Sequence, residues 1–300
     1  MNNSISDDLD DVEPTRKVLF MLGVRAAIKE LTKAPLSAKF GFAIVFIYIF
    51  VSLFAPLLTP FGETEIVGKK FMEWDSQYLL GTDHLGRDML TRVIYGARNT
   101  VGIALVTTVF TFVLGGISGI MAAVLGGWID QTLSRVVDVM MAIPGLIFAM
   151  LLLSIFGSSV ISLILIIGFI DATRVYRLAR AVSLNVVVMD FVEAAKLRGE
   201  KLIWITIDEV LPNILAPMVA EFGLRFCFVF LTISALSFLG LGIQPPTADW
   251  GSMVRETADL ITFGDYTPLI PAAAIAILTI GVNFIVDWFL YKTSGLKDEF

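Results

Sequence analysis

Long stretches of this sequence contain no Lys, Arg, Asp or Glu, and four of them constrain the fold more than any other feature. They cover residues 41–58, 99–129, 139–170 and 266–286. A helix that crosses a bilayer needs about 17–25 predominantly apolar residues. The chain is 56% hydrophobic and only 17% charged, whereas soluble proteins average about 45–50% and about 25%. The sequence therefore predicts a membrane protein with several spans.

The predicted fold class is an all-α membrane protein with six transmembrane helices. The run over 139–170 is too long for one span, and Gly157-Ser158-Ser159 provides a natural break. The charged residues Asp171, Arg174 and Arg177 lie at or just beyond the end of the fourth segment. The predicted helices cover residues 38–58, 99–124, 136–156, 160–175, 211–236 and 268–290.

The placement of basic residues predicts the orientation of these spans. With the N-terminus inside, the cytoplasmic segments hold fifteen of the 22 Lys and Arg residues, the outer segments hold six, and Arg225 lies within a span. Cytoplasmic loops carry the excess of positive charge in membrane proteins. Both termini, the loop after Gly126 and the segment 176–210 are therefore predicted to face the cytoplasm.

The chain divides by composition into three predicted parts. Residues 1–37 form a polar, acidic cytoplasmic tail that does not resemble a cleavable secretory signal. Residues 38–98 hold the first transmembrane helix and an outer cap segment, and residues 99–300 hold the transmembrane core.

Several functions are excluded or disfavoured by what the sequence lacks. There is no Gly-x-x-x-x-Gly-Lys-Ser/Thr phosphate loop, so ATP hydrolysis by this chain is not expected. Cys227 is the only cysteine and His84 the only histidine, which excludes an internal disulfide and sites built from several such ligands. His84 is expected to be a surface or hydrogen-bonded residue rather than a nickel ligand. The net charge of −6 argues against nucleic-acid binding. An enzyme is not expected.

A charged segment between two apolar runs is the most informative loop. Residues 189–198 are predicted to form a short helix, and Gly199 follows where helices often end in a left-handed turn. Pro212 is predicted in the first turn of the next span, where its missing N–H is harmless. Two interpretations remain open at this point: an amphipathic helix lying at the membrane surface, or a helix that docks into another protein.

Two Gly-rich motifs are predicted on the outer side. In residues 80–98, Gly81 and Gly86 permit tight turns, and Asp83, Arg87 and Asp88 are expected to form a local ion-pair cluster. The second motif runs from Leu236 to Pro246 and is followed by Asp249-Trp250-Gly251. Its tryptophan suits the membrane interface.

Polar residues inside the predicted spans are candidates for function. Glu221 and Arg225 lie about 15–21 Å along the fifth span at 1.5 Å per residue, and ionisable groups at that depth are costly. They are four residues apart, so a structural pair is one interpretation and lining of a transport pathway is the other. Asn283 and Asp287, also four apart, are expected to tie helices together.

Three motifs together resemble a known family. Glu193-Ala194-Ala195, three residues, Gly199 and then Pro212 resemble the Glu-Ala-Ala loop of importer-type ABC transporter permeases. Both outer motifs resemble the second, C-type permease subunit of dipeptide, oligopeptide and nickel importers, from about Pro35 to the C-terminus. The chain departs from the family pattern with acidic residues at 208–209 and with Ile233 where relatives usually carry Glu.

The resemblance implies a role and a set of partners. It implies that the Glu-Ala-Ala loop docks onto an ATP-binding subunit, and that the chain pairs with a homologous permease in a heterodimer. Two ATP-binding subunits would use ATP and Mg, with no cofactor bound by this chain, and a solute-binding protein would act outside. It also implies the bacterial inner membrane and transport of di- or oligopeptides. Alternatives are nickel, an opine or another small solute, or an ATPase-independent secondary transporter.

Overall fold

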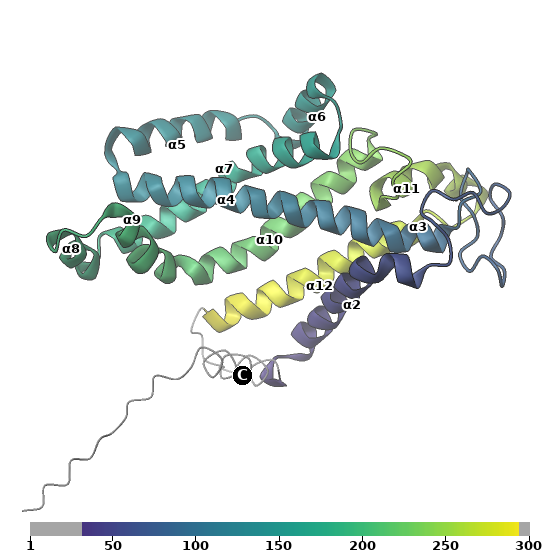
Figure 1. The fold of residues 1–300 in the computed structure, drawn as a ribbon, viewed down its shortest axis with the longest axis horizontal. Coiled ribbons are helices and arrows are strands. Elements are labelled where there is room, and N and C mark those ends of the chain that lie inside the picture. The colour runs from purple at the N-terminus through teal and green to yellow at the C-terminus, as the bar shows by residue number, and fades with distance from the viewer. Residues whose placement is uncertain (1–31, 294–300) are drawn as a thin grey trace, which may run out of the picture.

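The computed structural model describes residues 32–293, and this part of the chain contains helices and no strand. Most of the long helices run roughly along one axis, and α6 stands away from it (Figure 1). Their bounds are α2 Leu36–Leu58, α3 Met89–Gly96, η1 Ala97–Val101, α4 Gly102–Leu125, α5 Gly127–Met141, α6 Gly145–Phe156, α7 Val160–Val187, α8 Asp190–Leu197, α9 Leu202–Trp204, η2 Ile205–Val210, α10 Leu211–Phe238, α11 Trp250–Thr257, η3 Ala258–Phe263 and α12 Leu269–Thr293.

Segments far apart in the sequence gather at the two ends of the molecule. Residues 59–88, α3 and α11 lie at one end, and α8 and α9 lie at the other (Figure 1). Helices α4, α7 and α10 pack against one another along the length between them. These three helices therefore connect the polar residues at one end of the molecule with those at the other.

The pair α4–α7 is the most closely packed in the fold because glycine lines one face of α4. A Cβ built at Gly115 would lie 2.4 Å from the carbonyl oxygen of Ala172, and one at Gly119 would lie 2.6 Å from that of Tyr176. Small residues spaced four apart let helix backbones approach in this way. The two helices run in the same direction, so the chain must return between them.

The return is made by α5 and α6, and here the prediction of one helix over 136–156 is wrong. The two helices are bent by 87° at residues 142–144. Pro144 has no backbone N–H and restricts the residue before it, which ends a helix. Helix α5 is held against α7 by an ion pair in which Arg180 Nη2 donates to Asp130 Oδ2 at 2.6 Å.

Three other predicted helices are present in the structure, but their first or last residues differ from the predicted ones. The second begins at Met89, ten residues early, because α3, η1 and α4 are continuous. The fourth continues to Val187 rather than ending at 175. The fifth begins at Leu202, because α9, η2 and α10 are also continuous.

The first and last helices form a second closely packed pair. A Cβ at Gly41 on α2 would lie 2.5 Å from the carbonyl oxygen of Gly281 on α12. The ring of Phe42 packs edge-on against that of Trp288, with centroids 5.6 Å apart. This pair flanks α10 and closes one side of the bundle.

Four helical segments in the described part of the chain are long and apolar enough to cross a membrane, and α5 with α6 would make a fifth if the bent pair counts as one span. These are α2, the continuous helix 89–125, the continuous helix 202–238 and α12. The all-α membrane fold is thus confirmed. The count of six spans, the orientation and the three-part division stay predictions, and most of the tail 1–37 lies outside the described residues.

Candidate functional sites

The short helix α8 is anchored to the rest of the chain by two small apolar side chains. Val192 and Ala195 are fully buried and pack in one hydrophobic cluster with Ile205 and Val210 of η2. The resemblance places Ala195 in the docking loop, and in the structure its side chain points into the chain's own core. Ala195 therefore fixes the position of α8 rather than its outer contact.

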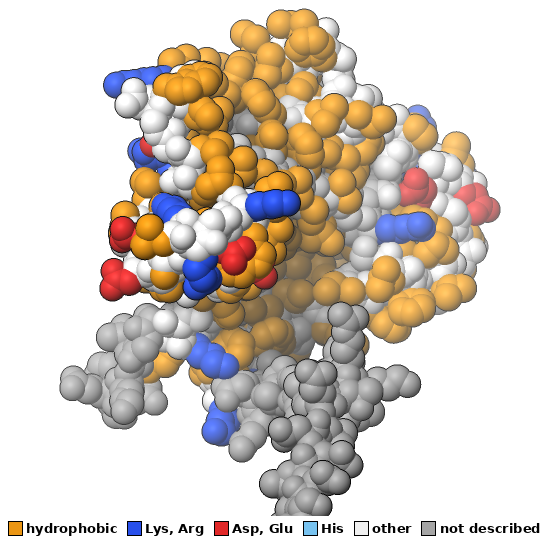
Figure 2. Space-filling view, turned by 60° about the vertical axis from the view of Figure 1, so that its left-hand side comes forward, with side chains coloured by type: hydrophobic (Ala, Val, Ile, Leu, Met, Phe, Trp, Pro, Cys, Tyr) orange, Lys and Arg blue, Asp and Glu red, His pale blue; other side chains and the backbone are white. Residues whose placement is uncertain are grey.

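The opposite face of α8 is open. Glu193 and Ala194 are exposed, and Leu197 retains 83% of its surface. Gly199 has φ of +80°, as the left-handed turn predicted, and a Cβ there would meet no atom within 4 Å. Charged side chains of both signs gather over this end beside a broad hydrophobic surface (Figure 2). One face of α8 is therefore free to contact another protein.

The acidic flank that follows α8 is split between two environments. Glu209 is half-buried, and its Oε1 lies 3.9 Å from Arg198 Nη2. Arg198 also lies over the ring of Trp204, 5.9 Å from its centroid. Asp208 is exposed. The charge of Glu209 is thus partly neutralised within the chain, whereas the side chain of Asp208 is exposed on the surface.

Pro212 does not begin a separate helix. It is the second residue of α10, and α10 directly follows the π-helical segment η2. A proline removes one backbone donor, and in membrane helices local π-helical adjustments can satisfy the backbone groups that a proline leaves free. As a result, α9, η2 and α10 form one continuous helix that runs from the end of the molecule near α8 through the apolar part of α10.

Glu221 and Arg225 form the pair that their spacing predicted. Arg225 Nη2 lies 2.6 Å from Glu221 Oε1, and its Nε donates to the same oxygen at 2.9 Å. Sequence reasoning missed a third member, because Asp171 on α7 lies 3.5 Å from Arg225 Nη1. Arg174 Nη1 also donates to Asp171 at 2.9 Å. The cluster joins α7 to α10 in the apolar part of the bundle.

The two polar residues of α12, Asn283 and Asp287, lie in different environments. Asn283 Nδ2 donates to the carbonyl of Thr279 at 2.8 Å and lies 3.8 Å from the sulfur of Cys227 on α10. Asp287 is exposed and makes no hydrogen bond or ion pair with any described residue. Within this chain Asp287 therefore does not tie helices together, contrary to the prediction.

The outer cap is organised by Asp83. Its Oδ1 accepts from the backbone N–H groups of Leu85 and Arg87, and its Oδ2 accepts from Arg87 Nε at 2.7 Å. Gly81 and Gly86 flank it with φ of +70° and +83°, as predicted. Burial raises the pKa of Asp83, but these hydrogen bonds and the charges of Arg87 and Arg92 outweigh it and hold the pKa below its usual value.

Asp88 has a different role from the one predicted. Its carboxylate accepts from the backbone N–H of Thr91 at 2.8 Å and so caps the first turn of α3. Aspartate is among the preferred residues at this position. It forms no ion pair with a described residue, so the ion-pair cluster contains Asp83 and Arg87 but not Asp88.

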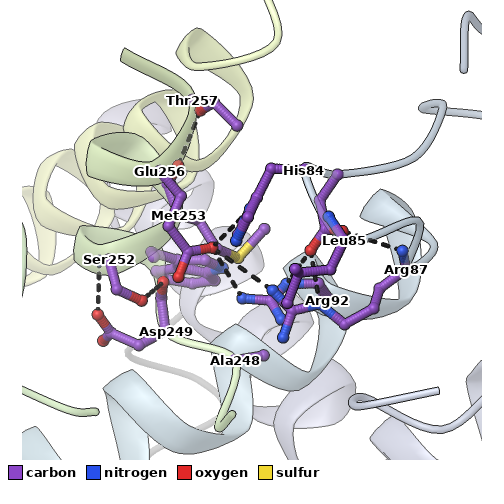
Figure 3. Close-up of polar contacts among 12 residues, drawn as sticks. His84, Leu85, Arg87, Arg92, Ala248, Asp249, Ser252, Met253, Glu256 and Thr257 are labelled. Atoms are coloured by element: carbon purple, nitrogen blue, oxygen red, sulfur yellow. Dashed lines mark hydrogen bonds and ion pairs between the residues drawn. The ribbon is translucent and has the colours of Figure 1, made fainter. Parts of the chain in front are cut away.

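Glu256 on α11 completes the cluster from far along the chain. His84, Arg87 and Arg92 converge on its carboxylate, with Arg92 Nη2 at 3.3 Å and the other two nitrogens at 3.6 Å (Figure 3). His84, Asp83 and Glu256 bring their ligand atoms within 4.8 Å of one another, a spacing open to a metal ion. The two arginines already neutralise both carboxylates, so an ion-pair network fits this set better than a cation site.

Trp250 is a second link across this end of the molecule, and its side chain packs inside the chain instead of facing its surroundings. Its side chain is 1% exposed, and its Nε1 donates to the carbonyl of Val93 at 2.9 Å. Asp249 caps α11 through Ser252 and accepts from the hydroxyl of Thr100. Burial raises the pKa of Asp249. These contacts fix α11 against the α3–η1 helix.

An all-helical chain with several apolar helices long enough to span a membrane, a solvent-exposed charged helix at one end and a compact polar cluster at the other has the features of a multi-pass membrane protein. Residues 113–292 match the family described as binding-protein-dependent transport system inner membrane component. The chain belongs to this family, and the resemblance drawn from its motifs is confirmed.

Individual relatives cover nearly the whole chain. The dipeptide transport system permease protein DppC of Alkalihalophilus pseudofirmus is 33% identical over 91% of this chain and 88% of the relative. The di/tripeptide transport system permease protein DppC of Pseudomonas aeruginosa is 31% identical over 86% and 85%. DppC of Escherichia coli K12 is 33% identical over 87% of each.

Proposed function

We propose that this chain is the transmembrane permease subunit of an ATP-driven importer of di- or oligopeptides, and that it forms half of the translocation pathway. The observation that carries the proposal is the geometry of α8. This helix is anchored from beneath by Val192 and Ala195 and leaves Glu193, Ala194 and Leu197 exposed. A helix held firmly on one side and open on the other can transmit force from a docked partner.

The connection from α8 into the bundle supports a coupling role. The positive-φ turn at Gly199 leads into one continuous helix over 202–238. A displacement of α8 would therefore be carried along α10 to the Asp171–Arg225–Glu221 cluster. The chain itself has no phosphate-binding loop, so the energy would come from two partner subunits that bind ATP and Mg.

The remaining partners follow from family membership and from the surface. The family depends on a binding protein, which would dock at the outer cap. Many large apolar side chains are exposed on the spans, which fits contact with lipid and with a homologous permease in a heterodimer. In this arrangement the chain has six spans, with α7 among them, both termini in the cytoplasm, and the bacterial inner membrane as its location.

The peptide substrate is inferred from the relatives. The three relatives above are named for dipeptide or di/tripeptide transport, and a relative in Brucella suis is named a putative peptide transport system permease. Identities of 31–34% support the class of cargo more strongly than one particular peptide.

Isolation of the intact complex tests this proposal. The full chain, tagged and extracted from the bacterial membrane in mild detergent, is expected to co-purify with a second permease and with ATP-binding subunits. ATPase activity of the complex is expected to rise when purified cognate binding protein and a dipeptide are added. A chain that is isolated alone and transports solute without any ATPase would contradict the proposal.

A further inference from the structure

A pocket of about 290 Å³ opens on the outer end of the molecule. One wall is the segment 71–82 from the outer cap, and the other is the segment 260–267 between α11 and α12. The two walls are about 190 residues apart in the sequence and are fastened together nearby by the Glu256 cluster (Figure 3). The pocket lies at the end opposite α8.

The backbone of the first wall is held in a strained conformation at Phe71. Phe71 has φ of +54°, the only positive value at a non-glycine residue among those described. Its N–H donates to the carbonyl of Asp83, and the next N–H, of Met72, donates to the hydroxyl of Thr82 at 2.8 Å. A positive φ is costly for a bulky residue and persists only when its surroundings enforce it. Strain of this kind gathers at binding sites.

The second wall is equally fixed. Gly264 ends η3 with φ of +80°. Asp265 Oδ1 accepts from the backbone N–H of Thr267 at 2.9 Å and from its hydroxyl. Both bonds use Oδ1, and no described residue forms a hydrogen bond or ion pair with Oδ2.

The lining combines exposed aromatic rings with negative charge. Trp74 is 62% exposed and Phe263 is 85% exposed, although both lie outside the apolar spans. The charged residues that line the pocket are Glu73 and Asp265, and no Lys or Arg lines it. Aromatic faces and carboxylates both attract a cationic side chain. The pocket is thus complementary in charge to Lys or Arg.

We propose that this pocket receives a Lys or Arg side chain from the extracytoplasmic solute-binding protein, and that it is a specific contact by which that protein docks. The inference rests on the proposed function and adds to it a place and a chemistry. The family description names dependence on a binding protein, and the pocket lies at the end away from the helix proposed to meet the ATPase. Aromatic and Arg contacts dominate many protein interfaces.

The test uses the intact transport complex in lipid nanodiscs and its purified cognate binding protein. We expect Glu73→Lys to weaken binding at least tenfold, and Trp74→Ala to weaken it several-fold. Asp259→Lys is the matched control, because Asp259 is exposed on the same outer segment but does not line the pocket. This control makes the same change in charge and is expected to weaken binding less than threefold.

Two readouts separate the possible failures. Basal ATPase activity and a single symmetric elution peak show that each variant complex is folded. If the wild-type complex does not bind the binding protein at all, the proposed function is wrong. If the wild-type complex binds and Glu73→Lys weakens binding no more than Asp259→Lys, the pocket is not the contact and the inference is overturned.

A covalent experiment identifies the partner atoms. The photoreactive amino acid p-benzoylphenylalanine at position 74 is expected to cross-link to a basic surface segment of the binding protein, found by mass spectrometry. The same probe at position 128, an exposed tryptophan on α5, is expected to give no such product. Cross-linking only to lipid or to the second permease from position 74 would contradict the assignment.

Discussion

Arg225 on α10 lies 3.5 Å from Asp171 on α7, and this ion pair joins two residues that are more than fifty positions apart in the chain. The same guanidinium holds Glu221 one turn earlier on its own helix. All three side chains are largely buried. An ionic group inside the bundle is tolerated because each charge has a partner, so the cluster behaves as a unit.

Neutralising one member should therefore cost more than neutralising all three. Arg225→Met leaves Glu221 unpaired and Asp171 with only the half-exposed Arg174, and is expected to lower the stability of the complex by about 3–5 kcal/mol. The variant Glu221→Gln/Arg225→Met is expected to recover part of the loss, and the triple variant with Asp171→Asn most of it. The measurement is thermal unfolding in detergent. Losses that simply add from one variant to the next would rule out a coupled cluster.

The close approach of α4 and α7 predicts opposite outcomes at neighbouring glycines. Gly115→Ala would place a Cβ 2.4 Å from a backbone oxygen of α7, which forces the helices apart and is expected to cost about 1–3 kcal/mol. At Gly116 the nearest atom is a flexible methionine methyl at 3.7 Å. Gly116→Ala is expected to be neutral or slightly stabilising, since Ala favours a helix over Gly by about 1 kcal/mol. Equal melting temperatures for the two variants would contradict this packing.

The outer cap should lose stability in acid through Asp83. The folded pKa of Asp83 lies below its unfolded value, because hydrogen bonds and the two arginines outweigh burial. Its stabilisation is therefore fully present above the unfolded pKa of about 3.9 and is lost as pH falls through the folded pKa. We expect the melting temperature of Asp83→Asn to lie below that of wild type at pH 6, with the difference shrinking below about pH 4. A difference independent of pH would show that the charge is not responsible.

The apolar runs predicted the membrane class and most of the helices, but not where the helices bend. Pro144 stood in the middle of an apolar run, and its backbone restriction was the signal for the 87° break. Apolar content alone could not reveal it. Helix α7 extends beyond its apolar part because Asp171 and Arg180 are neutralised by other helices. A count of charges within one segment overlooks such partners.

Contacts within a few residues were predictable, and distant ones were not. The spacing of Glu221 and Arg225 and the turn at Gly199 followed from local geometry. Glu256 meets Arg92 only because α11 folds back onto α3, and no local spacing indicates that contact. The buried side of α8 was also hidden, since its core partners lie on η2.

The central claim is that α8 couples the permease to ATP hydrolysis, and ATP-driven dipeptide uptake into proteoliposomes tests it most directly. The complexes carry wild-type chain, Glu193→Lys, Leu197→Asp or the control Asp259→Asn on the outer face. We expect both α8 variants to assemble in the membrane but to lose uptake by at least tenfold, with no stimulation of ATPase activity by the loaded binding protein, while the control transports normally. Wild-type rates of uptake by both α8 variants would contradict the claim.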